Sequence, residues 1–587
     1  MSVNTLTLVD DSELKERIRK AALLNAVAHD GKAQPGAIVG KILGEKVELR
    51  SRVKELSNVI SKVVEEVNNL SLSEQKAIVL EKWPETQKKK ETEEKQLSDL
   101  PNAEKYKQIV TRFSPNPDCV LHLGSARAII LSHEYAQIYK GKFILRFEDT
   151  DPKVKKASLK FYESIREDLK WLGCKIDEEY IQSDRLPIYY KYSNKLIADG
   201  NAYVCECVPE DFRNKVIAKK PCPCRTLTST ENLERWERML NGGYLEGQAV
   251  VRIKTDLENP NPAVRDWPAL RIIDTKKYPH PRVGSKYVVW PLYNLAAGLD
   301  DHLMGMTHII RGKEHYTNMV RQKYMYQHLG WQYPEAIHYG RLKITGAFLS
   351  KSKIVQGIKE GIYSGYDDPR LGTFAALRKR GITPEAIKKM IIEVGTKSND
   401  VTLSWKNLYS HNRKILDATS NRYFFVPTPT QITVKSIPKT FHVKLPLHPE
   451  KPDRGYREYE IKPINGDTVE LWISNKDAET FEPEKIIRLI ELFNIKIKKV
   501  TAENITAEFI SESYEEIRKI KAKLIQWVPK GAEYQCQIVL PDASLVEGYC
   551  ENECKKLKPN TTLQFERYGF VNIKEASNKL IAYYAHK

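Results

Sequence analysis

TRFSPNPDCVLHLGSARAIIL, Thr111 to Leu131, places the end of an apolar strand, a loop with two prolines and the start of a helix in direct succession. The strand begins with QIV just before it, and the helix continues as SARAIILSHEYAQIY. GKFILRFED then has the pattern of a buried strand that ends in acidic residues. A strand, a helix and a strand within about forty residues form a βαβ unit. The stretch therefore predicts the first half of a nucleotide-binding parallel sheet.

The loop of residues 113–124 would lie at the carboxyl end of its strand, where open α/β sheets bind ligands. The N-terminus of the following helix supplies free N–H groups and a positive dipole end, which suit phosphate. His122 can donate to phosphate oxygens, Gly124 allows close approach of a nucleotide, and Pro115 and Pro117 stiffen the loop. The alternative is that this histidine and glycine only cap the helix.

A second candidate element is GRLKITGAFLSKSK, Gly340 to Lys353. It predicts a strand followed by a loop in which Lys351 and Lys353 are flanked by serines. A mobile cationic loop at the other edge of a nucleotide site can hold pyrophosphate, where the charge matters most in the transition state. The alternative is an exposed surface loop.

The bulk properties of the chain set limits on its class. Its 587 residues predict three to five domains. The net charge of +18 and the pI near 9.2 indicate a polyanionic partner such as nucleic acid, although a lysine-rich proteome would give the same balance. No apolar run approaches the ~18 residues of a membrane span, and the first residues lack the apolar core of a signal peptide. We expect a cytoplasmic protein whose nine cysteines are not a disulfide framework.

The remaining pattern divides the chain further. Residues 12–82 predict helices, with 29–40 as a turn region and 46–70 as one amphipathic helix of about seven turns. Residues 84–102 form a charged linker. A second sheet-like stretch at 286–312 makes the intervening segment an insertion, and 367–416 predict helices. Beyond Arg422 short β patterns predict barrels or a sandwich.

The two loop motifs, taken in order, resemble the paired signatures of class I aminoacyl-tRNA synthetases. HLGS, residues 122–125, stands for His-Ile-Gly-His, and FLSKS, residues 348–352, stands for Lys-Met-Ser-Lys-Ser. RFSPNPDCVLHLGSAR, RFEDTDP, DDHLMGMTHIIRGKEH, SGYDDPRLGT and RKRGITPEAI all resemble the glutamyl/glutaminyl branch. The helical N-terminal part and the β-rich C-terminal part resemble its archaeal-type glutamyl members, because bacterial ones carry a helical anticodon domain.

The resemblance implies a multidomain α/β protein with a Rossmann-type catalytic domain. It further implies these parts: an N-terminal helical domain (1–83), a charged linker (84–104), catalytic half 1 (105–200), an inserted tRNA acceptor-binding domain (201–285), catalytic half 2 (286–345), a signature-loop and helical domain (346–421), and an all-β barrel domain that binds the anticodon (422–587).

The resemblance also implies an activity: ATP, with Mg²⁺, activates L-glutamate, which is then attached to the 3′ end of tRNA-Glu, with tRNA-Gln left open as a second acceptor. A monomer is expected, and no membrane partner. The implied catalytic residues are His122, Gly124, Ser125 and Lys351. The implied ATP site consists of Pro115, His122, Gly124, Ser125, Ser350 and Lys351, and the implied substrate site of Arg112, Ser114, Glu148, Tyr293 and Arg311.

Within the substrate site, the resemblance gives each residue a role. Arg112 meets the substrate side chain, Glu148 accepts the α-ammonium, and Tyr293 lines the pocket. Arg311 stands where glutaminyl enzymes carry an uncharged residue, and RFEDTDP stands where they usually have RFDDTNP. A buried γ-carboxylate requires cationic partners, so glutamate is the expected substrate. The alternative for Arg311 is an ordinary ion pair with Asp300 or Asp301.

Two rival functions remain open at this stage. The first is a glutaminyl-tRNA synthetase, which Arg311 and RFEDTDP disfavour. The second is a non-catalytic RNA-binding relative, which the survival of both signatures disfavours.

Two positions depart from the family's pattern. Cys119 stands where the glutamyl family usually has glycine, so the turn must tolerate a side chain. Ser125 replaces the second signature histidine, which leaves His122 and Lys351 to carry more of the phosphate charge.

The insertion contains a C-x-C…C-x-C pattern, made by Cys205, Cys207, Cys222 and Cys224. Four thiolates on two tight turns can close a tetrahedral zinc site, which would fold the tip of the insertion. One residue within each pair is shorter than the commoner spacing of two. Four reduced cysteines beside a hairpin are the alternative.

Overall fold

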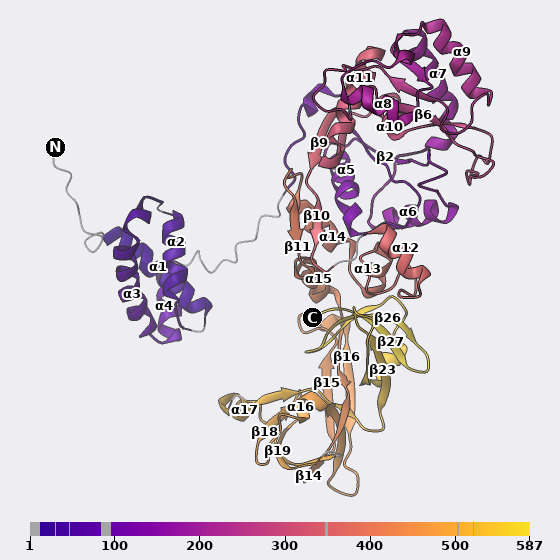
Figure 1. Cartoon of the computed structure of the whole chain (residues 1–587). Helices are drawn as coiled ribbons and strands as arrows, with labels where there is room; N and C mark the ends of the chain where they lie inside the picture. Colours follow the sequence, from indigo (N-terminus) through magenta and orange to yellow (C-terminus); the bar gives the residue numbers. More distant parts are fainter. Residues whose placement is uncertain are drawn as a thin grey trace, which may run out of the picture. The chain divides into compact units, whose positions relative to one another are not determined.

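The computed structural model describes residues 12–29, 31–45, 47–83, 96–346, 350–501, 504–520 and 522–587 (Figure 1). The chain divides into two compact units, Met1–Lys95 and Gln96–Lys587, each of which has its own core. Among the described residues, no helix is both long and apolar enough to cross a membrane.

The N-terminal unit is a helical bundle. Its described elements are α1 (Ser12–Ala28), α2 (Pro35–Glu45), the 3-10 turn η1 (Val47–Arg52), α3 (Val53–Asn68) and α4 (Leu72–Lys82). One face of α3 buries Leu56, Ile60, Val64 and Val67, as its spacing predicts.

Two predictions for this unit were wrong. Residues 35–40, expected to belong to the turn region, instead form the first part of α2, which Pro35 can start because its fixed φ suits the first helical position. The single helix expected over 46–70 begins only at Val53, after the tighter turn η1. Lys46 and most of the charged linker, residues 84–95, lie outside the described residues.

The second unit opens with the predicted parallel sheet. β1 (Val110–Phe113), β2 (Lys142–Phe147) and β3 (Glu178–Ile181) run parallel in that order, with α5 (Ala126–Ile138) connecting the first two. β8 (His308–Gly312) and β9 (Glu335–Tyr339) form a second parallel pair. Thr307 joins the two sheets, because its N–H donates to the Val110 carbonyl at 3.1 Å and its Oγ1 accepts from the Val110 N–H at 2.9 Å. The other helices here are α6 (Leu159–Trp171), α7 (Leu186–Ala198), α10 (Tyr293–Leu303) and α11 (Tyr316–Leu329).

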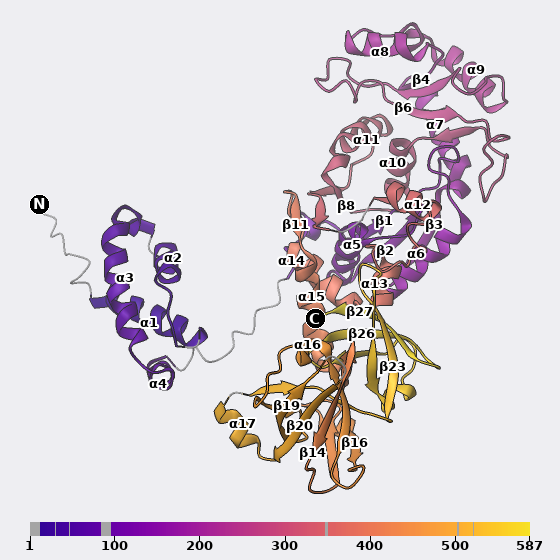
Figure 2. The same cartoon turned by 60° about the horizontal axis from the view of Figure 1, so that its bottom comes forward.

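The insertion between these halves has an antiparallel sheet of its own (Figure 2). Its elements are β4 (Ala202–Cys205), α8 (Pro209–Ile217), η6 (Pro223–Thr226), α9 (Ser229–Leu240), β5 (Val250–Ile253), β6 (Pro268–Ile272) and β7 (Val289–Pro291). Because β7 pairs with β6, this sheet continues past residue 285, the boundary expected from the sequence.

The next section is mainly helical, as predicted. β10 (Leu342–Ile344) pairs in parallel with β11 (Val401–Leu403), and the helices are α12 (Lys351–Lys359), α13 (Phe374–Arg380), α14 (Pro384–Val394) and α15 (Trp405–Thr419). Lys351 and Lys353, expected on a mobile loop, lie instead in the first turn of α12. Phe348 and Leu349 of the second signature lie outside the described residues.

The C-terminal part forms two seven-stranded sheets with the orders β12-β25-β26-β27-β23-β24-β13 and β21-β18-β19-β20-β14-β17-β22, and the hairpin β15–β16. Alternate residues of β17 are buried, which explains the period-two pattern of TVELWI. The strands are β12 (Arg422–Tyr423), β13 (Phe425–Pro427), β14 (Pro429–Lys435), β15 (Phe441–Pro446), β16 (Tyr456–Ile461), β17 (Val469–Ser474), β18 (Ile486–Leu489), β19 (Asn494–Val500), β20 (Asn504–Ser511), β21 (Lys523–Ile525), β22 (Val528–Pro529), β23 (Glu533–Val539), β24 (Leu545–Glu551), β25 (Thr562–Phe565), β26 (Gly569–Ala576) and β27 (Leu580–His586), with the short helices α16 (Asn475–Ala478) and α17 (Tyr514–Ile520).

Candidate active site

A cleft of about 790 Å³ opens at the carboxyl ends of β1 and β2. The loop that follows β1 and the first residue after β2 both line it, as the rule for parallel sheets predicts. Six of the residues expected in the site form part of its walls: Ser114, Pro115, Ser125, Glu148, Tyr293 and Lys351.

His122 lies at the turn that begins the helical segment beside the cleft. Its Nδ1 accepts a hydrogen bond from the Gly124 N–H at 3.0 Å, so the neutral ring carries its proton on Nε2. The residues just before α13 fix the turn, since the Leu123 N–H donates to the Gly372 carbonyl at 2.9 Å. Burial and the nearby Lys351 lower the pKa of His122 to about 4. The imidazole therefore offers an N–H donor at pH 7 but no charge, contrary to the expectation that it shares the phosphate charge.

Lys351 brings the second signature element to the first. Its Nζ lies 2.9 Å from Oδ1 of Asp118, in the loop that precedes His122. Ser350 precedes it at the N-cap of α12, with its Oγ 3.2 Å from Oγ of Ser352. The lysine also lines the cleft, so it is more than a residue of an exposed surface loop.

A fully buried carboxylate, Asp301 of α10, is connected through Arg146 to Glu148, which lines the cleft. Its Oδ1 accepts from Arg112 Nε at 3.0 Å and from Arg146 Nη1 at 2.7 Å. Burial alone would raise its pKa, but the two guanidinium groups lower the pKa of Asp301 to about 2. Arg146 also donates to Glu148 at 3.0 Å, and burial raises the pKa of Glu148 against this partner. Arg112, expected to meet the substrate side chain, thus donates its Nε–H to a carboxylate of the protein itself.

Arg311 of β8 has no carboxylate partner among the described residues. Its Nη1 donates to the Tyr293 hydroxyl at 3.3 Å, and its Nη2 donates to Gln322 Oε1 at 3.2 Å and to the Tyr333 hydroxyl at 3.0 Å. Its Nε is buried and has no hydrogen-bond partner in the described part of the chain. The side chain is buried, with 5% of its surface exposed.

The alternative ion pairs of Arg311 are therefore absent. Asp301 is taken by Arg112 and Arg146, and Asp300 accepts from Arg185 Nε at 2.8 Å. Three buried guanidinium groups, those of Arg112, Arg146 and Arg311, face two carboxylates, those of Glu148 and Asp301. One positive charge remains unbalanced, and an unbalanced buried charge favours an anionic ligand.

Four polar residues that line the cleft were not found from the sequence: Asn116, Asn294, His315 and Asn318. Oδ1 of Asn116, Oδ1 of Asn294 and Oγ of Ser114, which was expected in the site, are buried and have no hydrogen-bond partner within the described ranges, which indicates that a polar ligand supplies one. His315 faces the ring of Tyr293 with centroids 5.4 Å apart, and Asn318 donates to its Nδ1 at 3.1 Å. Isolated asparagines and histidines carry no sequence signal that separates them from surface residues.

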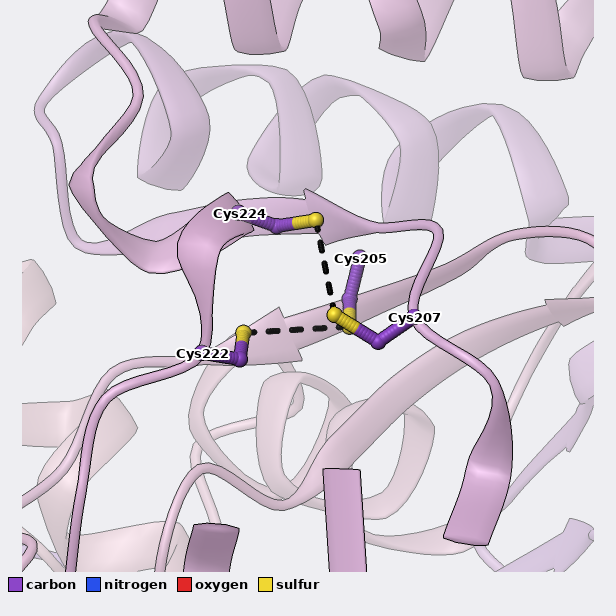
Figure 3. A group of neighbouring side chains, drawn as sticks. All are labelled: Cys205, Cys207, Cys222 and Cys224. Carbon is purple, nitrogen blue, oxygen red and sulfur yellow. Dashed lines mark hydrogen bonds between the residues drawn. The ribbon is translucent and has the colours of Figure 1, made fainter. Parts of the chain in front are cut away.

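The four cysteines of the insertion come together as the pattern predicts (Figure 3). Cys205 ends β4, and Cys222 and Cys224 lie at η6. Their Sγ atoms lie within 4.8 Å of one another, with Cys205–Cys222 at 4.0 Å and Cys207–Cys224 at 3.8 Å. A tetrahedron with Zn–S bonds of ~2.3 Å has S–S edges of about 3.8 Å, so the donor set fits zinc. Among the described residues no other group of this kind occurs.

Comparison with known proteins identifies the family of the chain. The family described as class I tRNA synthetases (E and Q), catalytic domain, matches residues 108–418. Anticodon-binding domains of the same enzymes match residues 420–515 and 524–574. The chain belongs to the class I glutamyl/glutaminyl tRNA synthetases.

Individual relatives match nearly the whole chain. Proteins named glutamate–tRNA ligase from Pyrococcus furiosus and Pyrococcus abyssi are 52% and 53% identical to it, over 98% and 97% of this chain and 100% of their own. One from Caldivirga maquilingensis is 44% identical over 98% of this chain and all of its own. Among solved structures, a glutamate tRNA ligase from Elizabethkingia meningosepticum, in complex with its amino acid, overlaps only in part: 22% identity, a TM-score of 0.40, and coverage of 54% of this chain and 70% of that one.

The departure of this synthetase at Cys119 is accommodated by the structure. Cys119 does not take a positive φ, so the turn does not demand glycine. Its side chain is buried in a small apolar cluster with Val120, Phe161, Val355 and Tyr366, which links the signature turn to α6 and α12. Ser125, the other departure, lines the cleft.

The lowered pKa of His122 predicts how the synthetase responds to pH. Because His122 is neutral well above pH 4, its protonation should not limit kcat/KM for ATP between pH 6 and 8. His122→Asn, whose side-chain oxygen can still accept the Gly124 N–H, should lower kcat by about 10²-fold through loss of the Nε2 donor. The shape of the pH profile should stay the same. An acid limb near pH 6.5 in the wild type that disappears in the variant would contradict the neutral imidazole.

Proposed function

We propose that this chain is a glutamate–tRNA ligase that uses ATP, with Mg²⁺, to attach L-glutamate to the 3′ end of tRNA-Glu. The observation that carries the choice of amino acid is the buried guanidinium of Arg311, which lacks a carboxylate partner among the described residues. The names of the full-length relatives support the same substrate. A monomer is part of this proposal.

In the first step, an oxygen of the glutamate α-carboxylate attacks the α-phosphorus of ATP. The new P–O bond gives glutamyl-adenylate, and the bond to the β-phosphate breaks to release pyrophosphate. Lys351, which lines the cleft, would leave its ion pair with Asp118 and place its positive charge beside the phosphates. His122 Nε2 and the N–H groups at the start of α5 add uncharged donors. Ser125 and Ser350 offer hydroxyls, and Pro115 and Gly124 shape the wall.

In the second step, the terminal 2′-hydroxyl of the tRNA attacks the carbonyl carbon of the adenylate. An ester bond forms, AMP leaves, and the hydroxyl proton is released. No side-chain nucleophile is needed, because positioning and charge stabilisation supply the rate.

The charge balance of the cleft supports glutamate over glutamine. The γ-carboxylate would pair with Arg311 beside the Tyr293 hydroxyl, and the α-ammonium would pair with Glu148, which lines the cleft. Arg112 would hold Asp301 in place and add to the positive potential that the substrate carboxylate experiences. An amide in place of the carboxylate would leave the guanidinium unpaired, at a cost of several kcal/mol. A glutaminyl enzyme is therefore the weaker candidate.

The other parts receive their roles in the same proposal. The insertion binds the acceptor end of the tRNA, and the two C-terminal sheets read the anticodon. Cys205, Cys207, Cys222 and Cys224 would hold a structural Zn²⁺. Its second shell would include the Glu206 N–H and Arg235 Nη1, each 3.5 Å from Cys224 Sγ. The ion would fix the tip of the insertion and take no part in the reaction.

Aminoacylation of purified tRNA-Glu and tRNA-Gln with labelled glutamate and glutamine tests the function. Glutamate should be attached to tRNA-Glu in an ATP-dependent reaction. Transfer of glutamate to tRNA-Gln as well would extend the substrate range without changing the mechanism. Exclusive use of glutamine would support the rival enzyme, and tRNA binding without any charging would support a non-catalytic protein.

Arg311→Cys tests the basis of the amino-acid choice. Removing the partner of a buried carboxylate should cost glutamate about 3–5 kcal/mol of transition-state binding. Glutamine should lose less or gain, so the ratio of kcat/KM for the two amino acids should fall. Arg341→Cys, at an exposed position just before β10, is the matched control and should leave the ratio unchanged. A constant ratio in Arg311→Cys would remove Arg311 as the discriminating residue.

Elemental analysis of the purified protein tests the zinc proposal. It should show about one zinc per chain, and Cys222→Ser should lose most of it. Cys174→Ser, which changes a buried cysteine outside the four, should retain the metal. A fully active preparation without zinc would end the proposal.

A further inference from the structure

Two sets of cationic residues line the cleft. Lys351, one of them, is paired with Asp118 beside the His122 turn. Lys155 and Arg321 line the cleft together with Pro268, the first residue of β6 in the insertion.

Arg321 is held in place by the insertion. Its Nε donates to the carbonyl of Ala263, in the loop between β5 and β6, at 2.6 Å. No carboxylate pairs with it in the described part of the chain. The side chain is half-buried on α11, and burial lowers its pKa. A desolvated guanidinium with free Nη donors at a cleft wall suits a phosphate.

Lys155 follows a segment that is also fixed to the insertion. Asp151 pairs with Arg271 at 2.8 Å, and Lys153 pairs with Glu246 at 2.6 Å. Lys155 itself is exposed, lines the cleft and has no carboxylate within ion-pair distance among the described residues. Two ion pairs therefore position the segment while the next lysine along it stays available.

We propose that Lys155 and Arg321 bind phosphodiester groups of the 3′-terminal nucleotides of the tRNA and so deliver the terminal ribose to the adenylate. The inference rests on the proposed function. ATP has one triphosphate, and Lys351 with the His122 turn accounts for it. The only further phosphates that the reaction brings to this cleft belong to the RNA, and they approach along the side bounded by the insertion.

Steady-state aminoacylation of Lys155→Ala and Arg321→Ala tests the proposal, with Lys156→Ala and Lys323→Ala as matched controls. Lys156 is the exposed neighbour of Lys155, and Lys323 lies on the same helix as Arg321; neither lines the cleft. Each test variant should lower kcat/KM for tRNA-Glu about tenfold, because a charge-assisted contact is lost. KM for ATP and for glutamate, measured at saturating tRNA, should stay unchanged, as should all three parameters in the controls.

The salt dependence of kcat/KM for tRNA is a second measurement. It should not change if the two residues have only a structural role. Loss of one phosphate contact should make the plot of log kcat/KM for tRNA against log salt concentration less steep by about 0.7. Arg321→Lys, which retains the charge, should recover most of the slope.

An increase of KM for ATP in the test variants would assign these cations to the nucleotide and overturn the proposal. Unchanged tRNA parameters, or a loss shared by Lys156→Ala and Lys323→Ala, would overturn it too. Failure of the proposed function is distinct from all of these outcomes, since the wild type would then not charge tRNA-Glu.

Discussion

Asp301 accepts hydrogen bonds from two buried arginines, and the cleft depends on this contact. Arg112 comes from β1, Arg146 from β2 and Asp301 from α10, so one carboxylate ties the first catalytic half to the second. Without it, two guanidinium groups would repel each other in a desolvated position. Because the carboxylate is already shared, it cannot also neutralise Arg311. The same contact therefore stabilises the fold and leaves the positive charge of Arg311 unbalanced.

The His122 turn is likewise supported by a distant part of the chain. α13 meets the turn at its N-terminal end, where the Phe374 N–H donates to the Leu121 carbonyl at 3.3 Å and Gly372, just before the helix, accepts from Leu123. At its C-terminal end, Arg380 donates to the carbonyls of Tyr584 and Ala585 in β27, at 3.2 and 2.8 Å. One seven-residue helix thus contacts both the His122 turn and the last strand of the C-terminal sheet. The site is built on rigid elements, as positioning catalysis requires.

The sequence predicts what local patterns determine. The βαβ unit, the two signatures and the C-x-C pairs depend on residues close together in the chain, and the structure contains the sheet and the cysteine cluster. The helix expected over 46–70 was wrong at its start, because an apolar period does not distinguish an α-helix from a 3-10 turn before it. Arg112 pairs with a carboxylate some 190 residues away in the sequence, and Arg311, with hydrogen-bond partners about 20 residues away, has no carboxylate partner among the described residues. Periodicity reveals neither arrangement. Asn116, Asn294 and His315 were missed for the same reason.

A crystal structure of the protein with L-glutamate bound tests the central claim most directly. The account predicts a γ-carboxylate oxygen within about 3 Å of a guanidinium nitrogen of Arg311, with Asp301 still bonded to Arg112 and Arg146. A γ-carboxylate that lies elsewhere in the cleft, while Arg311 keeps only its contacts with Tyr293, Gln322 and Tyr333, would contradict it.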